Sequence, residues 1–167
     1  IDTVGKSKVL FDEIEEQFAF VGGSEDQFVS YFARPDVQCL WEWHLADEAS
    51  AFCGVSAVPK KDSKQRKILM PCSFNYMLTD PQAVAFTGLP GGTALADLYV
   101  PGDAVQVSTM DQDNSFTRAR APRWMWAWAT APPVRAQSVW SLLPAALRAE
   151  CCPSTWVAPQ YTRLAMG

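Results

Sequence analysis

The sequence predicts a mixed α/β (α+β) fold, in which N-terminal helices precede a hairpin and part of a sheet. Apolar residues recur at helical spacing in the first fifty residues, whereas alternating or continuous apolar runs bounded by turn residues follow. Hydrophobic residues make up 49% of the 167-residue chain, which is enough for a buried core and excludes a disordered tail. We therefore divide the chain into a helical segment (1–50), a hairpin with its connection (51–100) and a partial sheet (101–167).

The first two helices are predicted from apolar spacing and a capping pattern. An apolar residue at every fourth position from Leu10 to Phe18 predicts a helix over 6–21 that faces the core. Ser24 is followed three residues later by Gln27, which is the pattern of a capping box at a helix start. A second helix is therefore expected directly after Ser24.

A third helix is expected over 37–49, and a β-hairpin follows it. The apolar runs AFCGVSAVP (51–59) and RKILMPCSF (66–74) read as two strands. The polar residues KKDSKQ lie between them, and their charged, Asp-Ser-containing sequence is typical of a turn. The hairpin is therefore expected to carry lysines at its free end.

The last third of the chain is predicted to supply two strands and a short helical tail. AVQVSTM and the following aspartate predict a strand over 104–111. Tryptophan occupies every second position from Trp124 to Trp128, which predicts a strand over 123–130 with one aromatic face. That face is expected to pack in the core, although a base-stacking platform would have the same pattern. A helix interrupted by proline is expected over 136–149.

Charge and cysteine content narrow the class of protein. The net charge is −4, but residues 1–50 carry −8 and residues 51–167 carry +4, so basic clusters lie in one part. The five cysteines match no zinc spacing, and with no signal peptide they predict reduced thiols and an intracellular protein. No apolar run is long enough for a membrane span.

Three features are candidates for chemistry. The single histidine, His44, has no nucleophile cue beside it and is expected to be structural. The basic run KKDSKQRK (60–67) could hold polyphosphate or a nucleic-acid backbone, although charged turns are usually only solvated. MDQDNSF (110–116) puts a carboxylate at a strand end, where it could hold Mg²⁺ or only cap a turn.

Taken together and in order, these motifs resemble the reverse transcriptase family, the RNA-directed DNA polymerases of retroelements. In that family a fingers hairpin carries an apolar-Pro, lysines, a turn and Arg-Lys-apolar, as does VPKKDSKQRKIL (58–69). A palm motif follows with Asp, four residues and an aromatic, as in MDQDNSF (110–116), and then a strand ending in Pro, as in WMWAWATAPP (124–133). A second palm motif begins Leu-Pro-x-Gly, where this chain has LAMG (164–167).

The resemblance implies a nucleotidyltransferase site with Mg²⁺ as cofactor. Asp111 would be the catalytic, metal-binding carboxylate, and the backbone of Gln112 would lie near the same metal. Phe116 would lie under the sugar of the incoming deoxynucleotide and exclude a ribose 2′-hydroxyl. Asp113 lacks an aromatic residue at the matching distance and is expected to be solvated.

The same resemblance gives the hairpin a role in substrate binding. Arg66 and either Lys60 or Lys61 would hold the nucleotide triphosphate. The implied partners are a primer–template of RNA and DNA and the deoxynucleotides.

Departures from the family pattern limit the expected activity. The family's paired-aspartate motif would lie beyond Gly167, and Ala165 replaces a proline of the second palm motif. The chain is therefore expected to be a fragment, inactive alone, of a reverse-transcriptase-like polymerase. The alternative is a non-catalytic nucleic-acid-binding or protein-assembly module derived from one. A truncated palm would leave a sheet edge uncovered, so a partner chain or an oligomer is expected.

Overall fold

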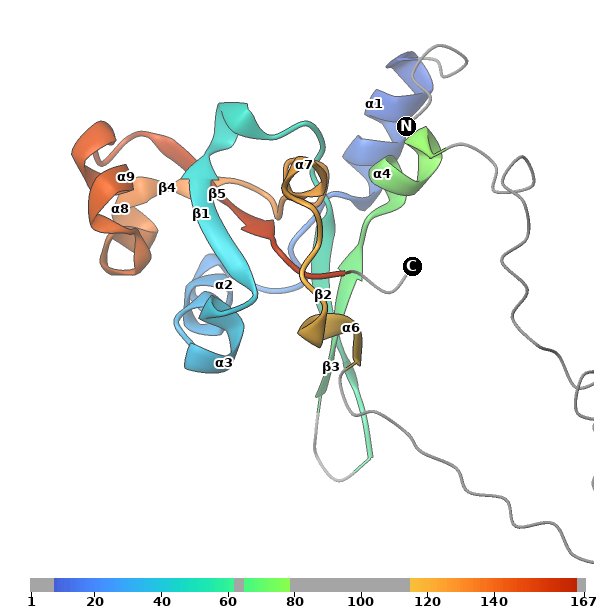
Figure 1. Cartoon of the computed structure of the whole chain (residues 1–167), viewed down its shortest axis with the longest axis horizontal. Helices are drawn as coiled ribbons and strands as arrows, with labels where there is room; N and C mark the ends of the chain where they lie inside the picture. The colour runs from blue at the N-terminus through green and yellow to red at the C-terminus, as the bar shows by residue number, and fades with distance from the viewer. Residues whose placement is uncertain (1–7, 62–64, 79–114, 165–167) are drawn as a thin grey trace, which may run out of the picture. The chain divides into compact units, whose positions relative to one another are not determined.

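The chain is described by a computed structural model over residues 8–61, 65–78 and 115–164, which all belong to one compact unit. The described residues form short helices and two small antiparallel sheets, so the predicted α+β class is confirmed (Figure 1). The expected strand over 104–111 lies outside the described residues. None of the helices within the described ranges is long and apolar enough to cross a membrane.

The larger sheet joins segments that are far apart in the sequence. Its strand order is β1 (Trp41–Leu45), β5 (Trp156–Tyr161) and β4 (Val134–Arg135), and each neighbouring pair is antiparallel. Trp41 pairs with Tyr161 and Leu45 pairs with Val157. All of β5 after its first residue is buried, because it lies in the middle of the sheet. The sequence patterns did not predict this strand.

The helix predicted over 37–49 is wrong. The only α-helix there is the four-residue α3 (Pro35–Gln38), β1 follows after two residues, and a single 3₁₀ turn (Ala46–Glu48) comes after β1. In β1 the tryptophans Trp41 and Trp43 alternate with less buried residues, which is the period of a strand with one face in the core. The pairing partner of β1 is more than a hundred residues away, so local spacing could not reveal it.

The two N-terminal helices form largely as expected. In α2 (Glu25–Phe32) the Gln27 N–H donates to Ser24 Oγ at 3.3 Å, and the Ser24 N–H donates to Gln27 Oε1 at 3.0 Å, so the capping box is confirmed. The first helix, α1 (Lys8–Phe18), is present, but none of its residues is fully buried. The predicted core-facing stripe is therefore wrong at Leu10, which is exposed.

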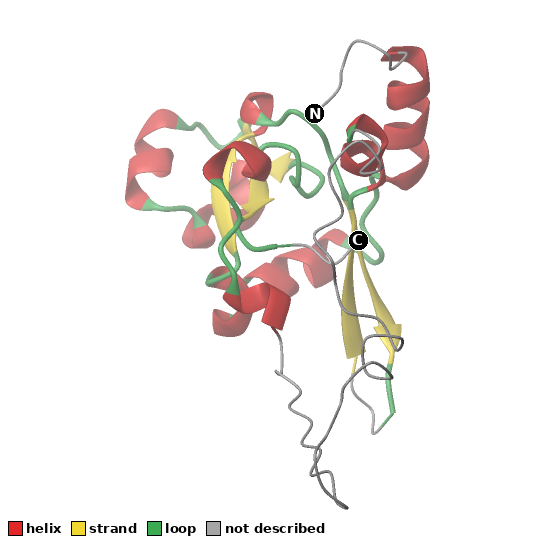
Figure 2. Cartoon of the chain, turned by 45° about the vertical axis from the view of Figure 1, so that its right-hand side comes forward, coloured by secondary structure: helices red, strands yellow, loops and turns green. Residues whose placement is uncertain are grey.

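The predicted hairpin is present and comprises β2 (Gly54–Pro59) and β3 (Gln65–Met70). The second strand ends at Met70 rather than Phe74, because Pro71 lacks an N–H and α4 (Cys72–Met77) begins after it. The base of β2 is held by the segment after α1, where the Val55 N–H donates to the Phe20 carbonyl at 2.8 Å. The free end of the hairpin points away from the larger sheet in Figure 1 and in Figure 2.

The tryptophan-rich segment is not the predicted strand over 123–130. It forms a short helix, α7 (Arg123–Trp126), followed by a turn. The turn places the fully buried Thr130 between Phe52 and Gln160. Thr130 forms a single β-bridge with each of them. Prolines at 122 and 132 lie on either side of the segment and limit ladder hydrogen bonding, which disfavours a regular strand here.

The tail agrees with its prediction. The helices α8 (Ala136–Val139) and α9 (Ala145–Glu150) are separated by a 3₁₀ turn, and α9 begins directly after Pro144. A proline is well tolerated just before a helix because the N–H it lacks would have no partner there. Val139, Leu143 and Leu147 from this tail enter the main core.

An aromatic cluster occupies the centre of that core. The Phe32 ring is 1% exposed and lies 5.1 Å from the Trp41 ring and 5.6 Å from the Trp43 ring, both in edge-on geometry. Trp41 in turn contacts Tyr161 with ring centroids 4.9 Å apart. The cluster therefore connects α2 to both long strands of the larger sheet.

Replacing Phe32 with Ala should strongly destabilise the fold. The substitution leaves a cavity between α2 and β1, and we expect a loss of about 3–5 kcal/mol in the free energy of unfolding. Urea unfolding followed by circular dichroism measures this loss. The matched control is Phe20→Ala at a half-exposed ring, with an expected loss of about 1 kcal/mol or less. Equal losses for the two variants would contradict this description of the core.

Candidate nucleic-acid interface

The free end of the β2–β3 hairpin carries the first group of candidate residues. Lys60 and Lys61 follow β2 directly and are exposed. Arg66 lies in β3, where its backbone is opposite Val58 in the antiparallel register. The sequence thus placed these three bases correctly on one hairpin, with both lysines accessible to a ligand.

Lys67, the next base on β3, is engaged by the protein itself. Its Nζ donates to Asp36 Oδ2 at 3.0 Å and lies 5.4 Å from the centre of the Tyr31 ring. Arg34 contacts the other carboxylate oxygen of Asp36 at 3.0 Å. These hydrogen bonds, the one from Lys67 first, lower the pKa of Asp36. The contacts attach β3 to α2 and α3, whereas Lys60 and Lys61, among the described side chains of the hairpin, are exposed.

The candidate metal site is less completely described. Asp111 and Gln112 lie outside the described residues, and so does the side chain of Phe116, whose backbone lies in α6 (Ser115–Arg118). Elsewhere, within 8–61, 65–78 and 115–164, no group of three His, Cys, Asp or Glu side chains could hold a metal ion. Mg²⁺ binding at Asp111 therefore stays a prediction.

The structure brings the chain after MDQDNSF next to the start of LAMG. The Leu164 N–H donates to the Ala119 carbonyl at 3.0 Å, and the Ala121 N–H donates to the Thr162 carbonyl at 2.9 Å. Arg120 and Arg163 form an antiparallel bridge between these two hydrogen bonds. The described residues that follow MDQDNSF are thus adjacent in space to Leu164, the first residue of LAMG.

His44 has the surroundings of a structural residue, as expected. It lies in β1, with Nδ1 3.1 Å from Glu48 Oε2 and Nε2 3.7 Å from Glu42 Oε1. Glu48 also accepts the backbone N–H of Leu45, so the carboxylate stabilises the turn after β1. The histidine and both glutamates belong to one short segment, which favours a role in holding that turn.

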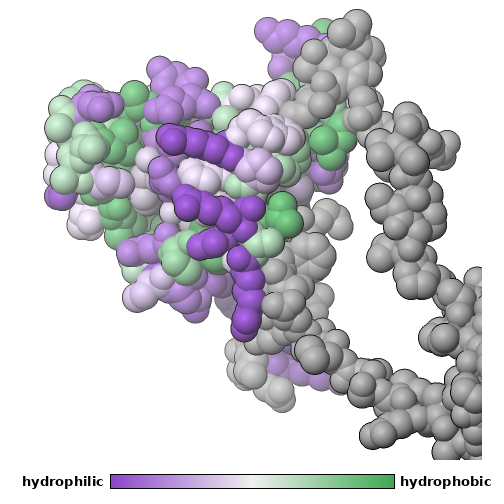
Figure 3. All heavy atoms as spheres, in the orientation of Figure 1, coloured by the Kyte–Doolittle hydropathy of each residue, from purple (hydrophilic) through white to green (hydrophobic). Residues whose placement is uncertain are grey.

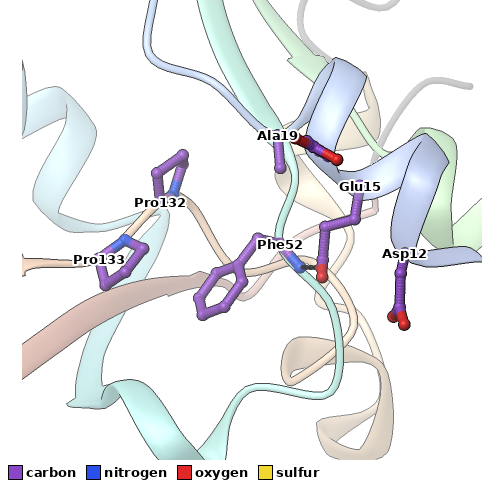
Figure 4. Close-up of a pocket in the computed structure, with 7 residues that line it drawn as sticks. Asp12, Glu15, Ala19, Phe52, Pro132 and Pro133 are labelled. Carbon is purple, nitrogen blue, oxygen red and sulfur yellow. Dashed lines mark hydrogen bonds between the residues drawn. The ribbon is translucent and has the colours of Figure 1, made fainter.

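Glu15 lines an acidic pocket that is poorly suited to nucleic acid. The pocket, of about 400 Å³, is bordered by α1, Phe52 and two prolines. Figure 4 shows the Glu15 carboxylate directed at the backbone of Phe52, whose N–H it accepts. Burial raises the pKa of Glu15, the hydrogen bond from Phe52 lowers it in part, and the charge of Asp12 raises it further.

The thiols differ strongly in their chemistry, which the sequence did not indicate. All five cysteines are free. Hydrogen bonds from Ser154 and Thr155 lower the pKa of the exposed Cys152 to about 7, so much of this thiol is ionised at neutral pH. Burial raises the pKa of Cys53 to about 12. Cys152 is therefore the thiol most open to alkylation or oxidation.

Comparison with known proteins gives no relative. No protein-family model, curated protein sequence or solved structure matches the chain.

Replacing Glu15 with Gln should stabilise the protein at neutral pH. The folded-state pKa of Glu15 is raised, so its contribution is most favourable below about pH 4.5 and is lost as the pH rises through the folded value. Glu15→Gln removes that loss while keeping an acceptor for the Phe52 N–H. Chemical unfolding at pH 4 and pH 7 should show a smaller loss between the two pH values in the variant. The variant Glu13→Gln controls for net charge, and an equal effect there would contradict the role of burial at Glu15.

Proposed function

We propose that the chain is a nucleic-acid-binding part of a reverse-transcriptase-like polymerase, corresponding to its fingers and the first part of its palm. The observation that carries the proposal is the β2–β3 hairpin, which ends in two exposed lysines. Its sequence, VPKKDSKQRKIL, is also the motif with the fullest resemblance to the family. In this role the lysines bind phosphate groups of a primer–template or of an incoming deoxynucleotide.

The geometry of the hairpin suits this role. Lys67 attaches β3 to α2 and α3 through Asp36, so the hairpin is held at its side while its free end stays accessible. Lysine ammonium groups on a protruding end can reach a phosphate without burying the strands beside it. The residues needed for support and those free for binding are therefore different.

The hydrogen bond between Ala119 and Leu164 gives a second line of support. In the family resemblance, the segments around these two residues belong to neighbouring palm motifs. Asp111 would hold Mg²⁺, and Phe116 would select the sugar. The bound Mg²⁺ would neutralise the charge that develops on the phosphoryl group during transfer.

One observation favours a non-catalytic descendant over a polymerase. The family resemblance requires a palm strand at WMWAWATAPP, but this segment forms α7 and a turn. A change of that kind beside the palm motifs would disturb a catalytic site more than a binding surface. The second candidate is therefore a module that binds nucleic acid without synthesis.

The double variant Lys60→Ala/Lys61→Ala should weaken binding to a primer–template. We expect the slope of log affinity against log salt to fall by about 0.9 for each phosphate that the variant no longer neutralises, because fewer counterions are released. Fluorescence anisotropy with a labelled DNA–RNA primer–template, titrated at several salt concentrations, measures both affinity and slope.

The matched control is Lys8→Ala, which removes a lysine charge from α1 and should leave the slope unchanged. Equal slopes for the wild type and the hairpin variant would sink the proposal. Primer extension with deoxynucleotides and Mg²⁺ separates the two candidates, since only a polymerase would give product.

A further inference from the structure

A second basic surface lies away from the hairpin, over α6 and α7. Arg118, Arg120 and Arg123 are all exposed and lie within six residues of one another, and Trp124 beside them is 58% exposed. We call these four residues, with Trp126, the α6–α7 surface. Figure 3 shows hydrophilic side chains gathered across the middle of this face, over α7 and α6.

Trp126 holds two of these arginines in place. Its ring is 5% exposed, and its indole N–H donates to the Ala121 carbonyl at 2.9 Å, which fixes the ring orientation. The guanidinium carbons of Arg120 and Arg123 lie 4.9 and 5.9 Å from the ring centre. Stacking on an aromatic ring leaves the guanidinium edges free to donate hydrogen bonds. The two guanidinium groups therefore lie over the ring, and no ion pair among the described residues neutralises them.

The electrostatics of this surface favour an anionic ligand. Arg120 is directly opposite Arg163 in the antiparallel bridge, and like charges in that position repel each other. Among the described residues, no ion pair involves Arg118, Arg120, Arg123 or Arg163. Residues 115–164 contain six arginines and a single acid, Glu150, so their net charge is +5. Phosphate groups placed here would relieve the repulsion.

Trp124 distinguishes nucleic acid from other polyanions. Trp124 is 58% exposed, more than any other tryptophan among the described residues, so its ring is available to a ligand. Aromatic rings beside a basic groove are the usual platform for unpaired bases, because every base can stack on them. An acidic polypeptide would satisfy the arginines but would give the exposed ring no comparable partner.

We propose that the α6–α7 surface binds single-stranded nucleic acid, with the arginines on the phosphates and Trp124 stacked on a base. The site lies on different residues from the hairpin and goes beyond the function proposed above. The proposed contacts, from arginine to phosphate and from tryptophan to base, do not involve the sugar 2′-hydroxyl. Single-stranded DNA and RNA should therefore bind alike. The single strand of a template next to its duplex would be one natural source of this ligand.

The test uses the full chain with labelled oligothymidylate and oligouridylate of about 16 nucleotides, the upper end of single-strand site sizes. Trp124→Ala should reduce affinity by roughly 5- to 100-fold, whereas Trp124→Phe, which keeps a ring, should retain most of it. Arg120→Ala/Arg123→Ala should reduce the salt slope by about 0.7 for each phosphate that is no longer neutralised. Binding to the wild type should also quench tryptophan fluorescence, and the quenching should shrink in Trp124→Phe.

Controls separate the surface from folding, from the hairpin and from general charge. Trp124 is outside the core, so its variants should keep the wild-type unfolding midpoint. Arg148→Ala removes an arginine from α9 and should bind as the wild type does. If Lys60→Ala/Lys61→Ala has no effect on the primer–template while the α6–α7 variants fail to bind the oligonucleotides, the hairpin proposal fails and this one stands.

Two results would overturn the inference. One is wild-type affinity for both oligonucleotides in Trp124→Ala and in the double arginine variant. The other is equal competition by a polyglutamate peptide at matched charge, with no dependence on Trp124. That second outcome would assign the surface to an acidic protein partner.

Discussion

The antiparallel pairing of β1 with β5 is the interaction on which the rest of the structure depends. It joins Trp41 to Tyr161 and so brings two segments more than a hundred residues apart into one sheet. The aromatic cluster around Phe32 packs on these strands, and the segment carrying Thr130 is hydrogen-bonded to the end of β5. Arg163, two residues after the end of β5, lies opposite Arg120 in an isolated bridge, so the basic surface is also connected to this pairing. These contacts join residues far apart in the sequence. Long loops must therefore close during folding before the contacts can stabilise the structure.

The elements that could be predicted from the sequence are those specified by their own residues. Ser24 and Gln27 form a capping box wherever the helix lies, and a polar turn between two apolar strands specifies the hairpin locally. The strands β1 and β5 could not be found this way, because each needs the other to satisfy its backbone hydrogen bonds. The incorrect strand prediction at WMWAWATAPP has a similar origin. Tryptophan at every second position is typical of a strand, but the bridges from Thr130 to Phe52 and Gln160 favour a turn.

The candidate sites likewise divide into one that is specified by local sequence and one that depends on distant contacts. Lys60 and Lys61 were recognisable because a basic hairpin end is a local feature. The α6–α7 surface was not, since it required knowing that Arg163 lies opposite Arg120 and that Trp126 stacks beneath two arginines.

Charge is also separated along the chain. Residues 8–50 carry ten acids and two bases, whereas residues 115–164 are strongly basic, so a polyanion would be directed away from α1.

The central claim is that the chain binds nucleic acid through the hairpin and the α6–α7 surface and not through its acidic helices. Hydrogen–deuterium exchange with and without a primer–template carrying a single-stranded overhang tests this most directly. We expect slower exchange in β2–β3 and from Ser115 to Trp126, with no change in α1. Unchanged exchange in both basic regions at a saturating nucleic-acid concentration, or protection confined to α1, would contradict it.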